Sequence, residues 1–216
     1  QARTTGNLIT LGIMPSRPDT GYGYIQFAED TGAVHPRVKR VKTFTEKPDH
    51  ATALRFMESG DFLWNAGIFI WSVKSIRQAF QEQLPDMHHL FASGASAYGT
   101  SEEGNFIAQA YDACANISID YGIMEKARNV NVITSEFGWS DLGTWGSLAT
   151  HLAPDASGNT AVGGALKLYD CERTMVHAND GRLVVLQGLE DYIVVSTPDA
   201  LLVCRKRDEQ MIRRIV

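Results

Sequence analysis

Short apolar runs and longer amphipathic segments alternate along the first part of the chain. Apolar runs that end at turn residues predict strands, and they lie at residues 8–13, 22–27, 38–44, 67–71 and 130–134. Helical patterning predicts helices at residues 49–60, 72–93, 101–114 and 119–127. Strands that alternate with helices indicate an α/β sheet.

Two local signals sharpen these boundaries. Asp49 is the expected N-cap of the first long helix, and Gly60 is its expected stop. The turn at Asp30–Gly32 predicts that the strands on either side of it pair as a hairpin.

The pattern changes near residue 153, which predicts a boundary between a domain at residues 1–152 and a second one at 153–216. Residues 153–159 combine Pro, Asp, Ser, Gly and Asn and are the expected linker. Short apolar runs separated by turn residues follow it, at 166–169, 175–177, 183–186, 192–195 and 201–204. This spacing indicates a small all-β domain, closed by a helix from about Asp208 onward.

Composition and charge narrow the class of protein. A hydrophobic content of 44% and a charged content of 21% are typical of a globular domain. The net charge of −5 argues against a nucleic-acid partner. No apolar run approaches the roughly 20 residues of a membrane-spanning helix. The three cysteines form no CxxC pair, which favours free thiols in the cytoplasm.

The run at residues 137–145 contains the first candidate for chemistry, Asp141, flanked by glycines and by Trp139 and Trp145. A carboxylate among tryptophans is costly to desolvate unless a positive charge meets it. A hard carboxylate of this kind suits Mg²⁺, which takes one or two protein carboxylates and keeps several waters. The alternative is that Asp141 caps a helix beginning near Leu142.

A second candidate is the pair Glu46 and Lys47, which follows a predicted strand and precedes Pro48. Lys47 suits a phosphate contact, and Glu46 suits hydrogen bonds from two sugar hydroxyls. Pro48 fixes the turn that leaves both side chains at the strand end. The alternative is an ordinary solvated loop.

Further candidates for substrate binding are Gly21, Tyr22 and Gly23, together with Asn65 and Gly67. Glycines on both sides of a tyrosine allow backbone amides to approach a ligand, although a hairpin bend has the same requirement. Asn65 at the mouth of a strand suits a hydrogen bond to a sugar hydroxyl. The alternative is an asparagine that stabilises a turn.

These residue types match the needs of sugar-phosphate activation. The phosphate of a sugar 1-phosphate attacks the α-phosphate of a nucleoside triphosphate and displaces pyrophosphate. This nucleophile is already anionic, because a phosphate monoester has a second pKa of about 6. The reaction therefore needs positioning, a divalent cation and cationic side chains rather than a general base.

In order and spacing the segments resemble the sugar nucleotidyltransferases, and most closely the mannose-1-phosphate guanylyltransferases. The resemblance covers nearly the whole chain. Its pieces are Leu11–Ile13, Arg17–Pro18, Gly21–Ile25, Phe44–Pro48, Trp64–Phe69, Ser118–Tyr121, Trp139–Trp145 and Asp191–Val195.

The resemblance implies a Rossmann-like catalytic domain followed by a small β-helix-like domain. It implies Mg²⁺-dependent transfer from GTP to mannose 1-phosphate, with GDP-mannose and pyrophosphate as products. It also implies roles for the matching residues: catalysis for Lys47 and Asp141, Mg²⁺ binding for Asp141, phosphate contact for Lys47, mannose contacts for Glu46 and Asn65, and pocket lining for Gly21 and Gly23.

The sequence departs from this family in one respect. The family's Gly-rich loop that wraps the triphosphate has no counterpart here, and neither has its second metal-binding Asp. We therefore expect a domain incomplete at its N-terminus, and 216 residues that are inactive alone. Exposed sheet edges predict a homodimer. Three alternatives stay open: transfer to glucose 1-phosphate from UTP or dTTP, a regulatory subunit that binds sugar nucleotide, and a parent protein with an isomerase domain after residue 216.

Overall fold

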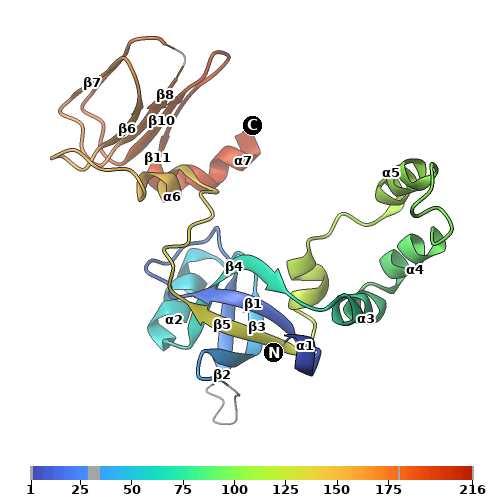
Figure 1. The fold of residues 1–216 in the computed structure, drawn as a ribbon. Coiled ribbons are helices and arrows are strands. Elements are labelled where there is room, and N and C mark those ends of the chain that lie inside the picture. The colour runs from blue at the N-terminus through green and yellow to red at the C-terminus, as the bar shows by residue number, and fades with distance from the viewer. Residues whose placement is uncertain (1, 29–34, 180, 216) are drawn as a thin grey trace. The chain divides into compact units, whose positions relative to one another are not determined.

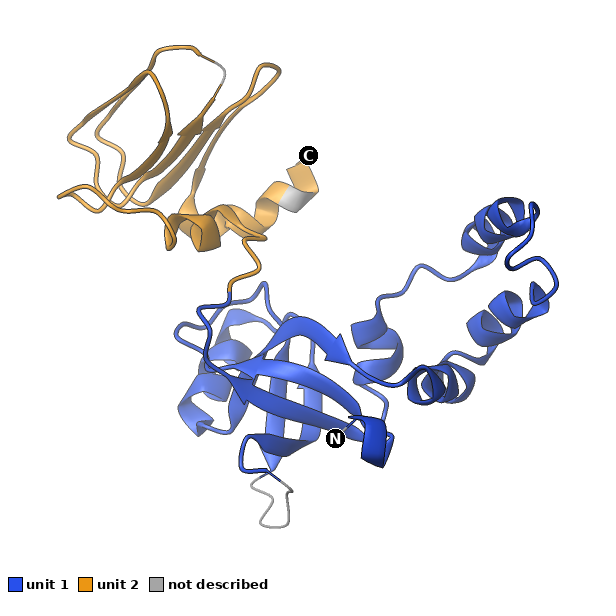
Figure 2. Cartoon of the chain, in the orientation of Figure 1, with its two compact units in different colours: residues 1–139 blue, residues 140–216 orange. Residues whose placement is uncertain are grey.

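The computed structural model of the chain describes residues 2–28, 35–179 and 181–215, with the backbone alone at residue 213. The chain forms two compact units, residues 1–139 and 140–216 (Figure 2). Within the described ranges, no helix combines the length and apolar character needed to cross a bilayer.

The first unit is built around a five-stranded mixed sheet that closes into a barrel in the order β1-β4-β2-β3-β5 (Figure 1). The strands are β1 (Leu8–Ile13), β2 (Tyr24–Ala28), β3 (Val38–Thr45), β4 (Phe62–Ile70) and β5 (Val130–Ser135). The β1–β5 pair is parallel and the other pairs are antiparallel. All five predicted strands are confirmed, and β4 begins five residues earlier than predicted, because Phe62–Ala66 is also buried in the sheet.

The predicted hairpin is confirmed in its pairing, since β2 and β3 run antiparallel. Its turn at Asp30–Gly32 lies outside the described residues.

The barrel interior is filled by aliphatic side chains with almost no exposed surface, among them Leu8, Ile25, Leu63 and Val132. Gly12 of β1 faces this core. A Cβ at Gly12 would lie 2.5 Å from Val132 Cγ2 and 2.7 Å from Leu63 Cδ1, so the packing leaves room for hydrogen alone.

Helix α2 (His50–Ser59) has the predicted ends. The Asp49 side chain accepts a hydrogen bond from the Thr52 N–H at 2.7 Å, as an N-cap does. Gly60 ends the helix in the left-handed conformation with φ of 75°, which costs glycine little because it has no Cβ.

The predicted helical region between β4 and β5 is confirmed as three helices that extend away from the barrel (Figure 1). They are α3 (Val73–Gln83), α4 (Pro85–Ser93) and α5 (Glu103–Ala113); a short helix, α1 (Ala2–Thr5), precedes β1. Helix α3 packs Ile76, Ala79 and Phe80 against the barrel core, whereas α4 buries no residue fully.

The helix predicted at residues 119–127 is shorter in the structure, a single π-helical turn, η1 (Asp120–Met124). The Glu125 N–H donates to the Asp120 carbonyl at 3.0 Å, five residues back, which widens the turn. Such turns often occur at functional sites.

The division between the units lies earlier than the boundary predicted after residue 152. Helix α6 (Trp145–Ala149) is held by the second unit, because the Gly146 N–H donates to Glu209 Oε2 at 2.9 Å and the Trp145 ring lies 5.3 Å from the His177 ring. The segment at 153–159, expected as a linker, is also an ordered part of this unit. Its Asn159 is buried and donates to the Cys171 carbonyl at 2.7 Å.

The second unit is β-rich, as predicted. Its strands are β6 (Thr160–Gly163), β7 (Leu166–Tyr169), β8 (Met175–Ala178), β9 (Val184–Gln187), β10 (Tyr192–Ser196) and β11 (Leu201–Arg205). Parallel pairing of β6 with β8, β8 with β10 and β7 with β9 stacks successive turns of chain, which is the arrangement of a β-helix. The predicted closing helix is confirmed as η2 (Lys206–Met211) followed by α7 (Ile212–Ile215).

The close packing around Gly12 generates a stability prediction. Gly12→Ala is expected to lower the free energy of unfolding by about 1–3 kcal/mol, because the new methyl overpacks the core. The control is Gly104→Ala in α5, where a Cβ meets nothing within 4 Å and alanine favours the helix by up to about 1 kcal/mol. Urea denaturation of both variants measures the difference, and an undiminished stability of Gly12→Ala would show that the barrel is loosely packed.

Candidate functional site

A cluster of polar side chains lies where three strands of the barrel meet. Tyr24 of β2 pairs with Thr45 of β3 on one side and with Trp64 of β4 on the other. The preceding residue, Gly23, therefore lies between Glu46 and Asn65. Its carbonyl accepts the Asn65 N–H at 2.8 Å. Strand register thus brings together three of the predicted substrate-binding residues.

Gly23 is required for this close approach. A Cβ at Gly23 would lie 2.3 Å from Glu46 Oε2 and 3.3 Å from the Asn65 Cβ. A side chain at this position would therefore displace the Glu46 carboxylate.

The Glu46 carboxylate is deeply buried, with 9% of its side chain exposed. Its Oε1 forms an ion pair with Lys47 Nζ at 3.0 Å. Its Oε2 accepts no hydrogen bond from any residue that the structure describes. Buried polar atoms are rarely left without a partner, so this oxygen can accept a hydrogen bond from a ligand or from water.

Burial raises the pKa of Glu46 above its ordinary value of 4.5. The hydrogen bond from Lys47 opposes this rise, and the negative charges of Asp120 and Glu125 add to it. Glu125 also holds the backbone of the loop, because its Oε1 accepts the Glu46 N–H at 3.1 Å.

Lys47 lies beside Glu46 with a left-handed backbone, φ of 47°. Such a conformation is costly for a residue with a side chain and occurs disproportionately at binding sites. The Lys47 side chain is 43% exposed, so its ammonium group remains accessible to an anion.

Both polar atoms of the Asn65 side-chain amide form hydrogen bonds. Its Oδ1 accepts from the Thr10 hydroxyl at 3.0 Å and from the Gly67 N–H at 3.1 Å. Its Nδ2 donates to Asp120 Oδ1 at 2.9 Å. Asn65 and Gly67 lie inside β4 rather than at the mouth of a strand or in a turn. Gly67 has a φ of 66°, and the pairing of β4 with β1 shifts register here, so the Asn65 oxygen holds an irregularity of the strand while its nitrogen faces Asp120.

Gly21 and Tyr22 lie in the loop before β2. The Gly21 N–H donates to Asp19 Oδ1 at 2.8 Å. The Tyr22 ring is buried and makes edge contacts with Trp64 at 5.0 Å and Trp139 at 5.3 Å. Tyr22 therefore packs mainly as part of an aromatic cluster beneath the loop.

Asp141 lies at the start of the second unit and is exposed, so the expectation of a carboxylate buried between tryptophans is wrong. The helix-cap alternative is wrong as well, because Thr144 caps α6 in a capping box with Ser147. Asp141 Oδ1 instead accepts the Gly143 N–H at 2.9 Å within a tight turn. A Cβ at Gly143 would lie 2.6 Å from Asp141 Oδ2, so a side chain there would shift the Asp141 carboxylate.

The polar cluster contains two residues to which the sequence assigned no role, Asp120 and Glu125. Asp120 falls within one of the matching segments, but its contact with Asn65 spans 55 residues of chain, and that of Glu125 with Glu46 spans 79. The described residues hold no group of three or more His, Cys, Asp or Glu side chains arranged around a metal ion.

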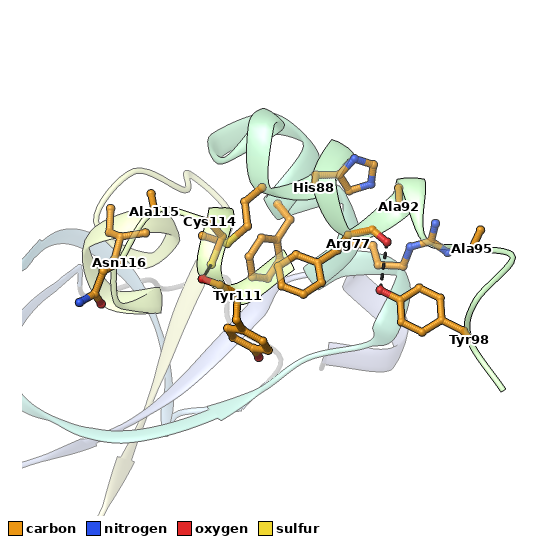
Figure 3. A pocket seen from close by; sticks show the side chains of 13 residues that line it. Arg77, His88, Ala92, Ala95, Tyr98, Tyr111, Cys114, Ala115 and Asn116 are labelled. Carbon is orange, nitrogen blue, oxygen red and sulfur yellow. Dashed lines mark hydrogen bonds between the residues drawn. The ribbon is translucent and has the colours of Figure 1, made fainter. Parts of the chain in front are cut away.

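A separate cavity of about 970 Å³ lies among α3, α4 and α5 (Figure 3). Its walls are mostly aromatic and aliphatic, and the Tyr98 hydroxyl donates to the Phe91 carbonyl across it at 3.0 Å. It shares no lining residue with the polar cluster.

Two families match the chain. The Nucleotidyl transferase family matches residues 1–157. The family of the MannoseP isomerase/GMP-like beta-helix domain matches residues 168–216.

Similar proteins cover the whole chain. Alginate biosynthesis protein AlgA of Pseudomonas aeruginosa is 36% identical over 100% of this chain and 44% of its own length. A mannose-1-phosphate guanylyltransferase of Escherichia coli is 34% identical over 98% of this chain and 46% of its own length. The chain thus spans less than half the length of these curated relatives.

Among solved structures, a protein of Thermus thermophilus described as a mannose-1-phosphate geranyltransferase matches with a TM-score of 0.82. It is 31% identical over 98% of this chain and 60% of its own.

The environment of Glu46 generates a titration prediction. By NMR, the Glu46 carboxyl is expected to titrate above 4.5. Asp120→Asn is expected to lower this pKa by removing a like charge, and Lys47→Met to raise it further by removing the cation. Because the raised pKa favours the protonated folded state, the associated stability is present below pH 4.5 and is lost as the pH rises through the Glu46 pKa.

Glu46→Gln should abolish this pH dependence, because glutamine does not ionise. The unfolding free energy of the variant minus that of the wild type should therefore increase as the pH rises through the Glu46 pKa. A Glu46 midpoint at or below 4.5 would mean that the carboxylate is already well solvated or fully paired.

Proposed function

The chain belongs to the Nucleotidyl transferase family, and from this we propose that it provides the sugar-phosphate side of an enzyme that transfers guanylate from GTP to mannose 1-phosphate, forming GDP-mannose and pyrophosphate. The choice of guanine and mannose is supported by the relative from Escherichia coli, which is named a mannose-1-phosphate guanylyltransferase.

The observation that carries the proposal is the buried, unpaired Oε2 of Glu46. A carboxylate oxygen in this state needs a donor, and the hydroxyls of a sugar supply donors without charge. Asn65 lies on the other side of Gly23, so a sugar ring at this place meets a carboxylate and an amide together. We assign Glu46 and Asn65 to the sugar hydroxyls.

Lys47 is assigned to the phosphate of the sugar phosphate. Its ammonium group is partly exposed next to Glu46, and a phosphate in place of solvent gains a charge-assisted hydrogen bond. In this arrangement Glu46 holds the sugar and the adjacent Lys47 holds the phosphate.

The proposed reaction needs no general base, because the attacking phosphate oxygen is anionic near neutral pH. The contribution of this chain is to orient that oxygen and to balance its charge. Asp141 is the residue we assign to Mg²⁺. The donor set fits in kind, since an exposed carboxylate with one oxygen fixed by Gly143 suits an ion that retains several waters. When bound, Mg²⁺ supplies positive charge to the phosphates.

The remaining parts of the proposal concern the setting of the reaction. We place it in the cytoplasm, where nucleoside triphosphates and sugar phosphates are made, and we expect a homodimer. The Gly-rich loop that would wrap GTP is not among these 216 residues, so we expect them to bind the sugar phosphate without turning it over.

Binding of mannose 1-phosphate to the 216-residue chain tests the site. By calorimetry, Glu46→Gln and Lys47→Met are each expected to weaken binding by about tenfold or more, the usual loss for a hydrogen bond or ion contact with a charged group. The control is Lys74→Met, an exposed lysine on α3, which should leave affinity unchanged. Equal affinities for all four proteins would exclude Glu46 and Lys47 from the site.

Turnover by the full-length gene product tests Asp141. Asp141→Asn is expected to lower kcat by about 100-fold or more, with a smaller change in KM. The variant would hold Mg²⁺ less well, so less positive charge would act on the transferring phosphates. The matched control is Asp199→Asn, another exposed carboxylate that holds a turn, by a bond to Thr197. The 216-residue chain assayed alongside should form no GDP-mannose. Normal turnover of Asp141→Asn would leave the carboxylate with a role in the turn alone.

A further inference from the structure

The hydrogen bonds of Asn65 determine what this residue can offer to a ligand. A carboxamide has two acceptor positions on oxygen and two N–H donors. Both acceptor positions are filled, by the Thr10 hydroxyl at 3.0 Å and by the Gly67 N–H at 3.1 Å. One donor is used by Asp120 Oδ1 at 2.9 Å. Within the described part of the chain, the second N–H has no acceptor.

The chemistry of the partners fixes the orientation of this amide. A backbone N–H such as that of Gly67 can only donate, so the atom facing it must be oxygen. A carboxylate such as Asp120 can only accept, so the atom facing it must be nitrogen. Rotating the amide by half a turn would set donor against donor and acceptor against acceptor. Thr10 is fully buried and Asn65 is 8% exposed, so water is not at hand to relieve such a mismatch.

We propose that Asp120 is a positioning residue that locks the Asn65 amide, so that Asn65 presents one N–H donor and no acceptor to the sugar. The ligand hydroxyl that meets Asn65 then accepts a hydrogen bond, and the hydroxyl that meets Glu46 donates one. The identity of the ligand in this statement rests on the proposed function.

Together the two contacts require that one sugar hydroxyl accepts a hydrogen bond from Asn65 and that another donates one to Glu46. Glu46 and Asn65 flank Gly23, because β3 and β4 pair with opposite sides of β2, and both side chains approach the place where a Gly23 Cβ would lie. The π-helical turn η1 contains Asp120 and places its carboxylate at the Asn65 amide.

A double-mutant cycle on mannose 1-phosphate binding tests the positioning role. Asp120→Ala is expected to weaken binding about tenfold, as for the loss of one well-oriented hydrogen bond. In the Asn65→Ala background the same change should cost less than about twofold, since Asp120 acts through Asn65. Asp120→Asn, whose amide oxygen can still accept from Asn65, should restore binding to within about threefold of the wild type. Additive losses in the cycle would mean that Asp120 contacts the sugar itself and would overturn the proposal.

Sugar analogues test the donor polarity. Fluorine accepts a hydrogen bond weakly and donates none. At the hydroxyl that meets Asn65, the deoxyfluoro analogue of mannose 1-phosphate should bind better than the deoxy analogue, and Asn65→Ala should remove this difference. At the hydroxyl that meets Glu46, the two analogues should bind equally weakly. A panel in which no position shows a difference that depends on Asn65 would contradict the assigned polarity.

A ligand-free measurement separates this inference from the proposed function. In ¹⁵N NMR spectra, the Asn65 side-chain proton that is bonded to Asp120 should exchange slowly in the wild type and about tenfold faster or more in Asp120→Ala, with thermal unfolding confirming that the variant is folded. Thr10→Val, a nearly isosteric change at the opposite end of the amide, should accelerate exchange as well. If mannose 1-phosphate fails to bind the wild type but the exchange pattern holds, the proposed substrate is wrong and the locked amide stands. Unchanged exchange in both variants would overturn the lock.

Discussion

The pairing register of β2 is the constraint on which the polar cluster depends. Because Tyr24 pairs with both Thr45 and Trp64, the residue before it is flanked by Glu46 and Asn65. A slip of one residue would turn these side chains to the opposite face of the sheet. The buried core residues of the same strands, such as Ile25 and Leu63, hold the register against such a slip. Hydrophobic packing within the barrel therefore sets the geometry of the polar site at its end.

The cluster is electrostatically costly in the absence of a ligand. A carboxylate with one unpaired oxygen is held in a buried position, with Asp120 and Glu125 as like charges nearby. Lys47 offsets part of this cost through its ion pair with Glu46. The left-handed backbone of Lys47 adds a conformational cost of its own. Fold stability alone would favour apolar or solvated residues at these places. A ligand hydroxyl that donated to the carboxylate would relieve the cost of its unpaired oxygen.

Much of the fold could be predicted from the sequence, because local chemistry determines it. Alternating apolar runs indicated the strands, and Asp49 and Gly60 indicated both ends of α2. The contact that ties α6 to the second unit, between Gly146 and Glu209, could not be predicted, because the two residues are far apart in the chain. The short π-helical turn at Asp120 was also missed, because helical patterning does not distinguish four-residue from five-residue hydrogen bonding.

Some residues of the candidate site could likewise be predicted from the sequence, and others could not. Glu46 and Lys47 were recognisable by residue type next to a strand end, whereas Asn65, expected at the mouth of a strand, lies within β4. Asp120 and Glu125 act across long separations in sequence, so only the folded chain reveals their contacts. Asp141 was expected among buried aromatic residues, but the glycines beside it form an exposed turn instead.

The most direct test of the account is a crystal structure of this chain with mannose 1-phosphate bound. The account predicts sugar hydroxyls within hydrogen-bonding distance of Glu46 Oε2 and Asn65 Nδ2, with the phosphate next to Lys47. A sugar phosphate bound elsewhere, with Glu46 Oε2 still unpaired, would contradict it.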